Sequence, residues 1–160
     1  MGSQREQVMN TLDRYLRLCD VPVRGEGMVE LGELFTDDAV WEGVGPEYSG
    51  EFGRREGRQA ILEMLAGYLP PNPHFRENVH LLFPGTIDLS DTTARGTWLM
   101  QQLSRYASGT AEVRVARLDV TFRLDPVRPA LISLFRTERL FSAPLASASP
   151  LSAPPPKEAV

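Results

Sequence analysis

The chain has few of the side chains on which several common chemistries depend. Its 160 residues include one lysine, Lys157, one cysteine, Cys19, and two histidines, His74 and His80. The lysine lies in a Pro-rich stretch near the C-terminus, which excludes Schiff-base chemistry on an ordered lysine. A single cysteine cannot form an intramolecular disulfide, so we expect a cytoplasmic protein in a reducing compartment.

Long apolar runs and an excess of positive charge are also lacking. No run approaches the roughly 18 residues of a membrane span, and the charged N-terminal region does not have the pattern of a signal peptide. The 17 basic and 21 acidic side chains give a formal net charge of -4. Neither a membrane nor a nucleic acid is therefore expected as a partner.

Motifs for metals and cofactors are missing as well. His74 and His80 are not accompanied by a cysteine pair or by a His-Glu-x-x-His helix, so no metal site is expected. The Gly-rich stretch between Gly43 and Gly57 has neither a dinucleotide-binding nor a P-loop pattern. No Gly-x-Ser-x-Gly elbow occurs. We expect an activity that needs no cofactor.

The residues that are present predict an α+β domain with its helices first. Ser3 and Glu6 form a capping-box pattern, and the apolar spacing that follows predicts a helix over about 4–20. Two further helices are predicted, one beginning near Met28 and one around 60–68, with the Gly-rich stretch between them read as a loop. Residues 143–160, rich in Pro, Ala and Ser, are predicted to be a disordered tail on a domain of residues 1–142.

Everything after Pro73 has the pattern of strands, at about 74–83, 86–89, 93–106, 111–124 and 130–142. Between Ala116 and Leu124 apolar and polar residues alternate strictly, so one face of the sheet should be buried. We predict a strongly curved antiparallel sheet wrapped around three N-terminal helices. Such a cone-shaped barrel can enclose a pocket.

Several segments together resemble the SnoaL-like group of the nuclear-transport-factor-2-like superfamily. They are Tyr15–Asp20, Leu34–Glu42 with its Phe-x-x-Asp-Ala-x-Trp pattern, the Gly-Arg-x-Ala-Ile piece at 57–61, His80 ahead of Ile87, and Asp119 with Arg123. The resemblance spans about residues 5–142 and implies the α+β cone. It also implies a pocket for a hydrophobic small molecule and an assembly as a homodimer.

By resemblance to dehydratases of the scytalone and bile acid types, the catalytic residues would be His80, Asp20 and Tyr15. His80 would move a proton, Asp20 would orient the imidazole, and Tyr15 would donate a hydrogen bond to an oxygen that gains negative charge. The residues themselves leave alternatives open. Taken by themselves, Asp20 can be a solvated carboxylate, His80 a core or rim histidine, and Tyr15 a core aromatic.

Other aromatic and sulfur-containing side chains are candidates for the pocket lining, namely Trp41, Tyr48, Phe75, Trp98 and Met100. The leading hypothesis is a dehydratase, isomerase or cyclase for a polycyclic or polyketide-like molecule. Epoxide hydrolysis is an alternative, suggested by the Arg-x-Asp pattern of Arg117 and Asp119. A second alternative is a module of the same fold that binds a small molecule or assembles without catalysis.

Overall fold

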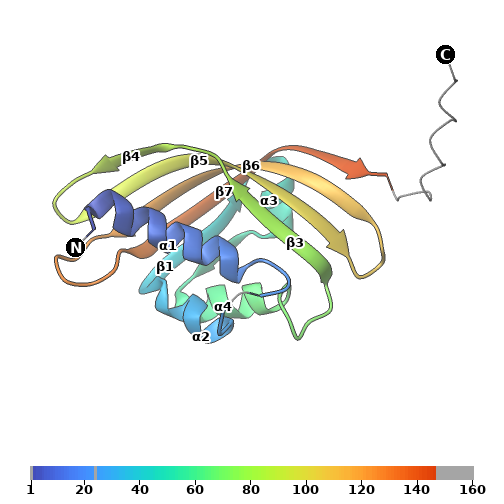
Figure 1. The fold of residues 1–160 in the computed structure, drawn as a ribbon, viewed down its shortest axis with the longest axis horizontal. Helices are drawn as coiled ribbons and strands as arrows, with labels where there is room; N and C mark the ends of the chain where they lie inside the picture. The colour runs from blue at the N-terminus through green and yellow to red at the C-terminus, as the bar shows by residue number, and fades with distance from the viewer. Residues whose placement is uncertain (1, 24, 147–160) are drawn as a thin grey trace, which may run out of the picture.

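The computed structural model describes residues 2–23 and 25–146 as helices packed under one curved sheet (Figure 1). Seven strands follow the order β2-β1-β7-β6-β5-β3, with β4 paired to the other half of β5. All neighbours are antiparallel except β1 and β7, which run parallel. The elements are α1 (Gln4–Leu18), α2 (Met28–Glu33), β1 (Phe35–Val44), α3 (Gly45–Glu51), β2 (Arg54–Glu56), α4 (Arg58–Ala66), β3 (Phe75–Leu82), β4 (Thr86–Leu89), β5 (Thr93–Tyr106), β6 (Ala111–Arg123) and β7 (Leu131–Leu145).

Helix α1 begins as its sequence predicts. The Ser3 hydroxyl accepts a hydrogen bond from the backbone of Glu6, and the Glu6 carboxylate accepts one from the backbone of Ser3, which completes the capping box. One face of the helix carries Val8, Leu12 and Tyr15 into the core, all of them buried. The helix lies across the concave side of the sheet (Figure 1) and closes one side of the molecule's interior.

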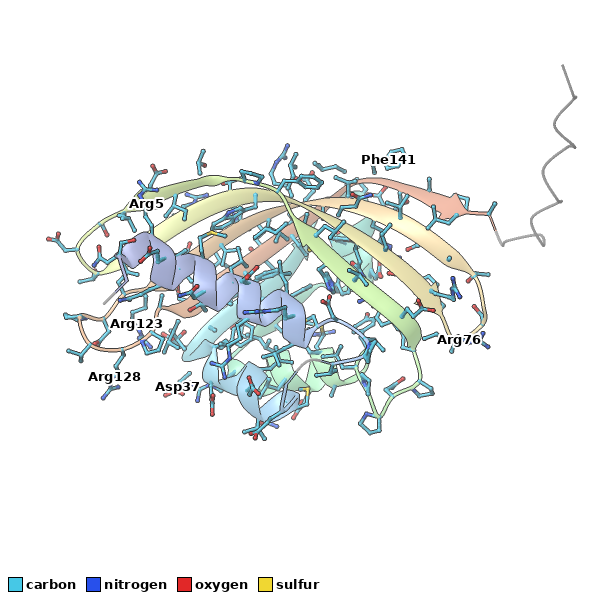
Figure 2. The ribbon with its side chains drawn as sticks, in the orientation of Figure 1. Arg5, Asp37, Arg76, Arg123, Arg128 and Phe141 are labelled. Atoms are coloured by element: carbon cyan, nitrogen blue, oxygen red, sulfur yellow. The ribbon has the colours of Figure 1, made fainter. Side chains whose placement is uncertain are left out.

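The alternation in β6 sets which side of the sheet is inside. Ala116, Leu118, Val120 and Phe122 are fully buried against the helices, while Arg117 and Arg123 are exposed. Charged side chains such as Arg5, Arg76, Arg123 and Arg128 extend outward from the periphery of the molecule (Figure 2). The predicted α+β architecture with a curved sheet is therefore confirmed.

Three details of the predicted fold are wrong. The Gly-rich stretch read as a loop contains helix α3, which begins at Gly45 with Pro46 in its first turn, where a missing N–H costs nothing. Strand β7 runs to Leu145, paired with Ala111, so residues 143–145 belong to the sheet and not to the tail. Within the described residues, the edge strands β2 and β3 do not pair, so the sheet is an open cone and not a closed barrel.

The remainder of the predicted tail, residues 147–160, lies outside the described residues. Among the helices that are described, none is both long and apolar enough to cross a membrane.

Candidate active site

A cavity of about 240 Å³ lies between the concave face of the sheet and the helices. Its walls come from α1, α3, α4, β1 and the inner faces of β3, β5, β6 and β7. Most of the polar lining side chains come from β3, β5 and β6, and the other elements contribute mainly apolar and aromatic side chains. The residues that line it are Tyr15, Leu16, Cys19, Trp41, Tyr48, Glu51, Phe52, Met64, Leu65, Tyr68, Leu69, His74, Phe75, Asn78, His80, Met100, Gln102, Tyr106, Arg114, Leu118, Phe135 and Thr137.

The predicted pair Asp20 and His80 is brought together at this cavity. Asp20 Oδ1 lies 2.8 Å from His80 Nδ1 and 3.0 Å from the backbone nitrogen of the same residue. The two side chains are only 16% and 9% exposed. The contact between Oδ1 and Nδ1 favours the tautomer of the neutral imidazole in which Nδ1 carries the proton and donates it to the carboxylate, and in that tautomer the lone pair is on Nε2.

Backbone pairing explains how two residues so far apart in sequence meet. Helix α1 ends at Leu18, and Asp20 follows just past the cap residue Cys19 and not in the last helical turn as predicted. Val21 then forms an antiparallel bridge with Asn78 of β3, through hydrogen bonds of 2.9 and 3.1 Å. This bridge fixes Asp20 beside the strand that carries His80.

Tyr15 lines the same cavity from α1 and is 4% exposed. Its hydroxyl oxygen accepts a hydrogen bond of 3.0 Å from Trp41 Nε1. Burial raises the pKa of the Tyr15 phenol well above its ordinary value, so the hydroxyl stays protonated. A protonated phenol held this way is a hydrogen-bond donor for an oxygen in the cavity.

Four of the five predicted lining residues do contact the cavity, namely Trp41, Tyr48, Phe75 and Met100. The prediction for Trp98 is wrong. Its indole is 2% exposed and packs against Phe122 and over Gly96, deeper in the sheet and away from the cavity. His74, expected to be exposed or at the pocket mouth, lines the cavity between Tyr68 and Tyr106.

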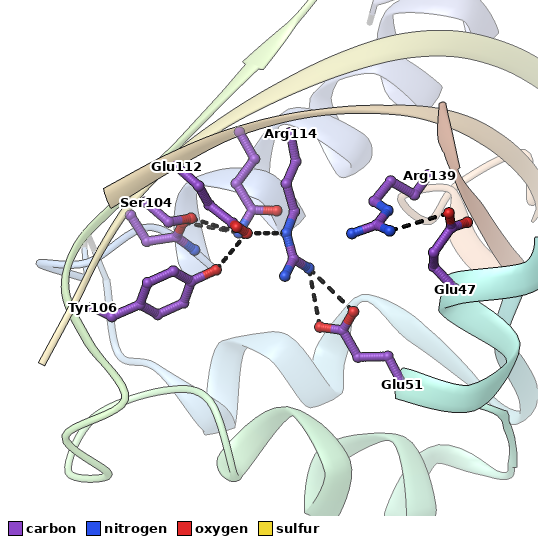
Figure 3. Close-up of polar contacts among 9 residues, drawn as sticks. Glu47, Glu51, Ser104, Tyr106, Glu112, Arg114 and Arg139 are labelled. Carbon is purple, nitrogen blue, oxygen red and sulfur yellow. Dashed lines mark hydrogen bonds and ion pairs between the residues drawn. The ribbon is translucent and has the colours of Figure 1, made fainter. Parts of the chain in front are cut away.

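An ionic cluster on one wall of the cavity was not predicted from the sequence (Figure 3). Arg114 of β6 donates from Nη1 to both oxygens of Glu51, at 3.0 and 3.3 Å, and from Nε to Glu112. The Tyr106 hydroxyl donates to the same Glu112 oxygen at 2.6 Å. Arg114 is in phase with Ala116 and Leu118 along the strand, and this parity was the available signal that it points inward.

A second polar group lies next to this cluster. Asn78 Oδ1 accepts hydrogen bonds from Gln102 Nε2 at 2.9 Å and from Ser104 Oγ at 2.8 Å. Asn78 Nδ2 in turn donates to the carbonyl of Cys19 at 3.5 Å, at the end of α1. These bonds hold β3, β5 and α1 together behind the imidazole of His80.

One alternative from the sequence, epoxide hydrolysis, is affected by these positions. Arg117 and Asp119, the basis of the epoxide hydrolase hypothesis, lie on the outer face of the sheet, where Asp119 is bound by Arg95 at 3.0 and 3.1 Å. They do not reach the cavity. Among the described residues, no group of three His, Cys, Asp or Glu side chains has the arrangement of a metal site.

Comparisons with known proteins agree with this architecture. The family model of the SnoaL-like domain matches residues 3–128. A comparison with curated proteins returns no match.

Solved structures share the fold at low sequence identity. A hexachlorocyclohexane dehydrochlorinase, LinA type 2, superposes with a TM-score of 0.74 at 18% identity, covering 95% of this chain and 94% of that one. A putative scytalone dehydratase from Novosphingobium aromaticivorans gives 0.72 at 17%, covering 94% of each chain. ActVI-ORFA from Streptomyces coelicolor gives 0.63 at 12%, covering 84% of this chain and 96% of that one. At these identities the likeness shows the fold alone.

Proposed function

The chain belongs to the SnoaL-like domain family, and from that premise we propose that it is a cofactor-independent acid/base enzyme. The substrate would be a hydrophobic polycyclic or polyketide-like small molecule. The reaction would be a dehydration, an isomerisation or a cyclisation that begins with removal of a proton from carbon. One observation carries the proposal: Asp20 and His80 form a partly buried pair, and His80 lines a cavity whose other walls are mostly apolar and aromatic.

Proton abstraction follows from the geometry of that pair. Asp20 accepts the Nδ1 proton of His80, so the Nε2 lone pair of the neutral imidazole is the base. It takes a proton from a carbon next to a carbonyl group, and Asp20 stabilises the imidazolium that forms. Tyr15 donates its hydroxyl proton in a hydrogen bond to the oxygen on which charge develops.

In the dehydration variant the atoms balance without a cofactor. The C–H electron pair becomes the second bond of a C=C group, and the adjacent C–O bond breaks. The leaving hydroxide takes the Nε2 proton from the imidazolium and departs as water, which restores neutral His80. An isomerase would instead return the proton to another carbon, and a cyclase would use the carbanion to form a C–C bond.

The neighbours in structure support the same class of chemistry. Two of them carry the names of a dehydrochlorinase and a dehydratase, and both names describe removal of a small molecule to leave a double bond. The alternative of a binding module is less well supported, because the cavity is not filled by side chains and a carboxylate–imidazole pair opens into it.

The proposal is tested by proton exchange, which does not require the natural substrate. Ring ketones such as 2-tetralone are incubated with the protein in D₂O, and loss of the α-proton signal is followed by NMR. We expect the wild type to exceed the buffer rate. His80→Ala should reduce the protein-dependent rate by about 100-fold or more, and Asp20→Asn should reduce it less. The double variant should be no slower than His80→Ala, because the pair acts as a unit.

His74→Ala is the matched control, since His74 lines the same cavity without a carboxylate partner for its ring nitrogens among the described residues. It should retain most of the exchange activity. Equal losses in the two histidine variants would contradict the role given to His80. An exchange rate in His80→Ala equal to that of the wild type, or a wild type no faster than buffer, would favour the binding module.

A further inference from the structure

Pairing in the sheet aligns three polar side chains across the cavity. His80 of β3 is opposite Gln102 of β5, and Gln102 is opposite Arg114 of β6. Neighbouring strands lie about 4.8 Å apart, so the backbones of His80 and Arg114 are separated by about 10 Å. The side chains of all three residues line the cavity. This separation of the two backbones is comparable to the length of a ligand with two fused rings, which could reach from the imidazole at one end to the guanidinium at the other.

The positive charge of the Arg114 guanidinium is already balanced by carboxylates of the protein. Glu51 and Glu112 both bind Arg114, whose side chain is 15% exposed. Burial by itself would raise the pKa of Glu112, but the hydrogen bonds from Tyr106 and Arg114 outweigh it and lower the pKa, so Glu112 is ionised at neutral pH. One positive charge therefore faces two negative ones, and the cluster carries a net charge of about -1.

Arg139 lies beside this cluster (Figure 3) but is paired with Glu47 at 3.1 Å, so that pair leaves the net charge around the cavity unchanged. Of the described residues that line it, Arg114 is the only arginine, and no lysine contributes. Asp20 adds a further carboxylate behind His80. A carboxylate ligand would meet like charges in a partly dehydrated space, where repulsion is stronger than in water.

An uncharged oxygen meets a different environment. The guanidinium has N–H donors on three nitrogens, and Nη2 donates to none of the described residues, since Arg114 binds Glu112 through Nε and Glu51 through Nη1. A carbonyl or hydroxyl oxygen can accept from Nη2 without displacing either carboxylate. Arg114 Cζ lies over the Tyr48 ring, 5.9 Å from its centroid, within the range of a cation–π contact.

We propose that the Glu51–Arg114 pair is a specificity determinant that makes the cavity accept uncharged, oxygen-bearing ring ligands and reject carboxylates. The proposal rests on the function above because it describes the substrate of the same cavity. Arg114 orients the oxygen, and Glu51 supplies the charge that excludes an anion.

The test compares two probes of nearly equal shape, 2-acetylnaphthalene and 2-naphthoate, which differ by a methyl group in place of a charged oxygen. Dissociation constants are measured by calorimetry at pH 7.5 and constant ionic strength. The wild type should bind the ketone at least about tenfold more tightly. Glu51→Gln, which keeps an oxygen for Arg114 but removes the charge, should raise the affinity for naphthoate by about tenfold and change that for the ketone by less than about twofold.

Glu47→Gln is the matched control. Glu47 lies on the same helix, is paired with Arg139 at 3.1 Å, and does not line the cavity (Figure 3). Glu47→Gln removes an equal charge nearby. If both variants bound naphthoate more tightly by the same factor, the effect would reflect only the general charge of the region, and the proposal would be overturned. Naphthoate affinities that stay at the wild-type value in Glu51→Gln would overturn it too.

The ratio of the two dissociation constants of the wild-type protein tests the proposal without any variant. Equal binding of the two probes, tighter binding of naphthoate, or no binding of the ketone would each overturn the proposal. These measurements follow binding and not proton transfer. Unchanged proton exchange in His80→Ala would therefore refute the acid/base function while leaving the charge preference of the cavity intact.

Discussion

The thiol of Cys19 shows how strongly the interior of this protein disfavours charge. Burial raises the pKa of Cys19 to about 12; the contact with Tyr15 opposes this rise, and the carboxylate of Asp20 adds a smaller contribution in the same direction as burial. The side chain is 7% exposed. Since only the thiolate reacts with alkylating agents, the native thiol should be inert even though it lies at the edge of the cavity.

We therefore predict that iodoacetamide at pH 8 modifies native Cys19 at least about 1000-fold more slowly than the unfolded chain, whose thiol has a pKa of about 8.5. Mass spectrometry of the quenched reaction gives both rates. Denaturation in guanidinium chloride supplies the internal control, because the chain has a single cysteine. Comparable rates in the native and denatured protein would mean that the thiol is accessible and ionised.

A second residue-scale prediction concerns Glu42, which lies between Arg136 at 2.7 Å and Arg54 at 3.0 Å and is 12% exposed. Burial works to raise its pKa, but the hydrogen bonds and charges of the two arginines outweigh burial and lower the pKa. A carboxylate with a depressed pKa stabilises the fold above its unfolded pKa of about 4.3 and loses that contribution as the pH falls.

Glu42→Gln should therefore lower the free energy of unfolding by about 1–3 kcal/mol at pH 7, and the difference should shrink as the pH falls below about 4. Urea unfolding at several pH values measures it. Glu63→Gln, on an exposed position of α4, is the control and should be near neutral. A Glu42→Gln effect that is the same at pH 7 and pH 3 would indicate lost packing and not lost charge.

At the residue scale, prediction succeeded where a pattern specified a position. Asp20 and His80 were chosen by resemblance, and they do meet. Arg114 was missed although it is in phase with the buried apolar residues of β6, because an arginine in such a pattern is usually read as exposed. Its burial depends on two carboxylates from other elements, Glu51 and Glu112, and a pairing of this kind cannot be deduced from local spacing.

At the scale of elements, β5 depends on a glycine. Gly96 lies under the indole of Trp98, and a Cβ at this position would collide with the six-membered part of that ring. Trp98 is 2% exposed and has little room to shift. Overpacking of a core costs about 1–3 kcal/mol.

Gly96→Ala should accordingly lower the stability by about 1–3 kcal/mol. Gly50→Ala is the matched control, since a Cβ at Gly50 in α3 meets nothing within 4 Å. That variant should be neutral or stabilised by up to about 1 kcal/mol, through the better helix propensity of alanine. Thermal unfolding of both proteins makes the comparison, and equal effects would show that the ring of Trp98 yields readily.

The strands of the C-terminal half were predicted well because β-periodicity and turn residues coincide there. Helix α3 was missed because five glycines between Gly43 and Gly57 favour a loop. Tertiary contacts outweigh that composition. Tyr48 is 3% exposed and packs on Phe52, and the pairs Glu47–Arg139 and Glu51–Arg114 hold the helix against the sheet. Its existence follows from the whole fold and not from its own sequence.

At the scale of the whole molecule, the outer face of the sheet bears on assembly. Arg117, Asp119, Thr121 and Arg123 alternate with the buried residues of β6, as predicted, and lie on this face with Leu99, the neighbour of Arg117 on β5. The charges are partly satisfied within the chain, since Asp119 binds Arg95 and Arg117 contacts Glu138 at 3.4 Å.

Beside these paired charges the outer face exposes apolar side chains to water, which is energetically unfavourable. Leu99 is 45% exposed, and Val79 and Leu81 on the adjoining β3 are 42% and 45% exposed. Exposed apolar side chains bordered by paired polar groups are a common composition of an interface between subunits. A two-fold axis through this face would bury the same side chains on both copies.

We therefore predict a homodimer formed through the outer face of the sheet. Light scattering at tens of micromolar should give about twice the 17.8 kDa of one chain. Leu99→Glu would place a charge among these apolar side chains and should shift the mass toward the monomer, because desolvating an unpaired carboxylate opposes association. Val127→Glu, in the loop before β7 where Val127 is 83% exposed, should leave the mass unchanged. A wild-type mass near 17.8 kDa would exclude the dimer. If Val127→Glu disrupted the dimer and Leu99→Glu did not, the interface would lie near the loop before β7 and not at Leu99.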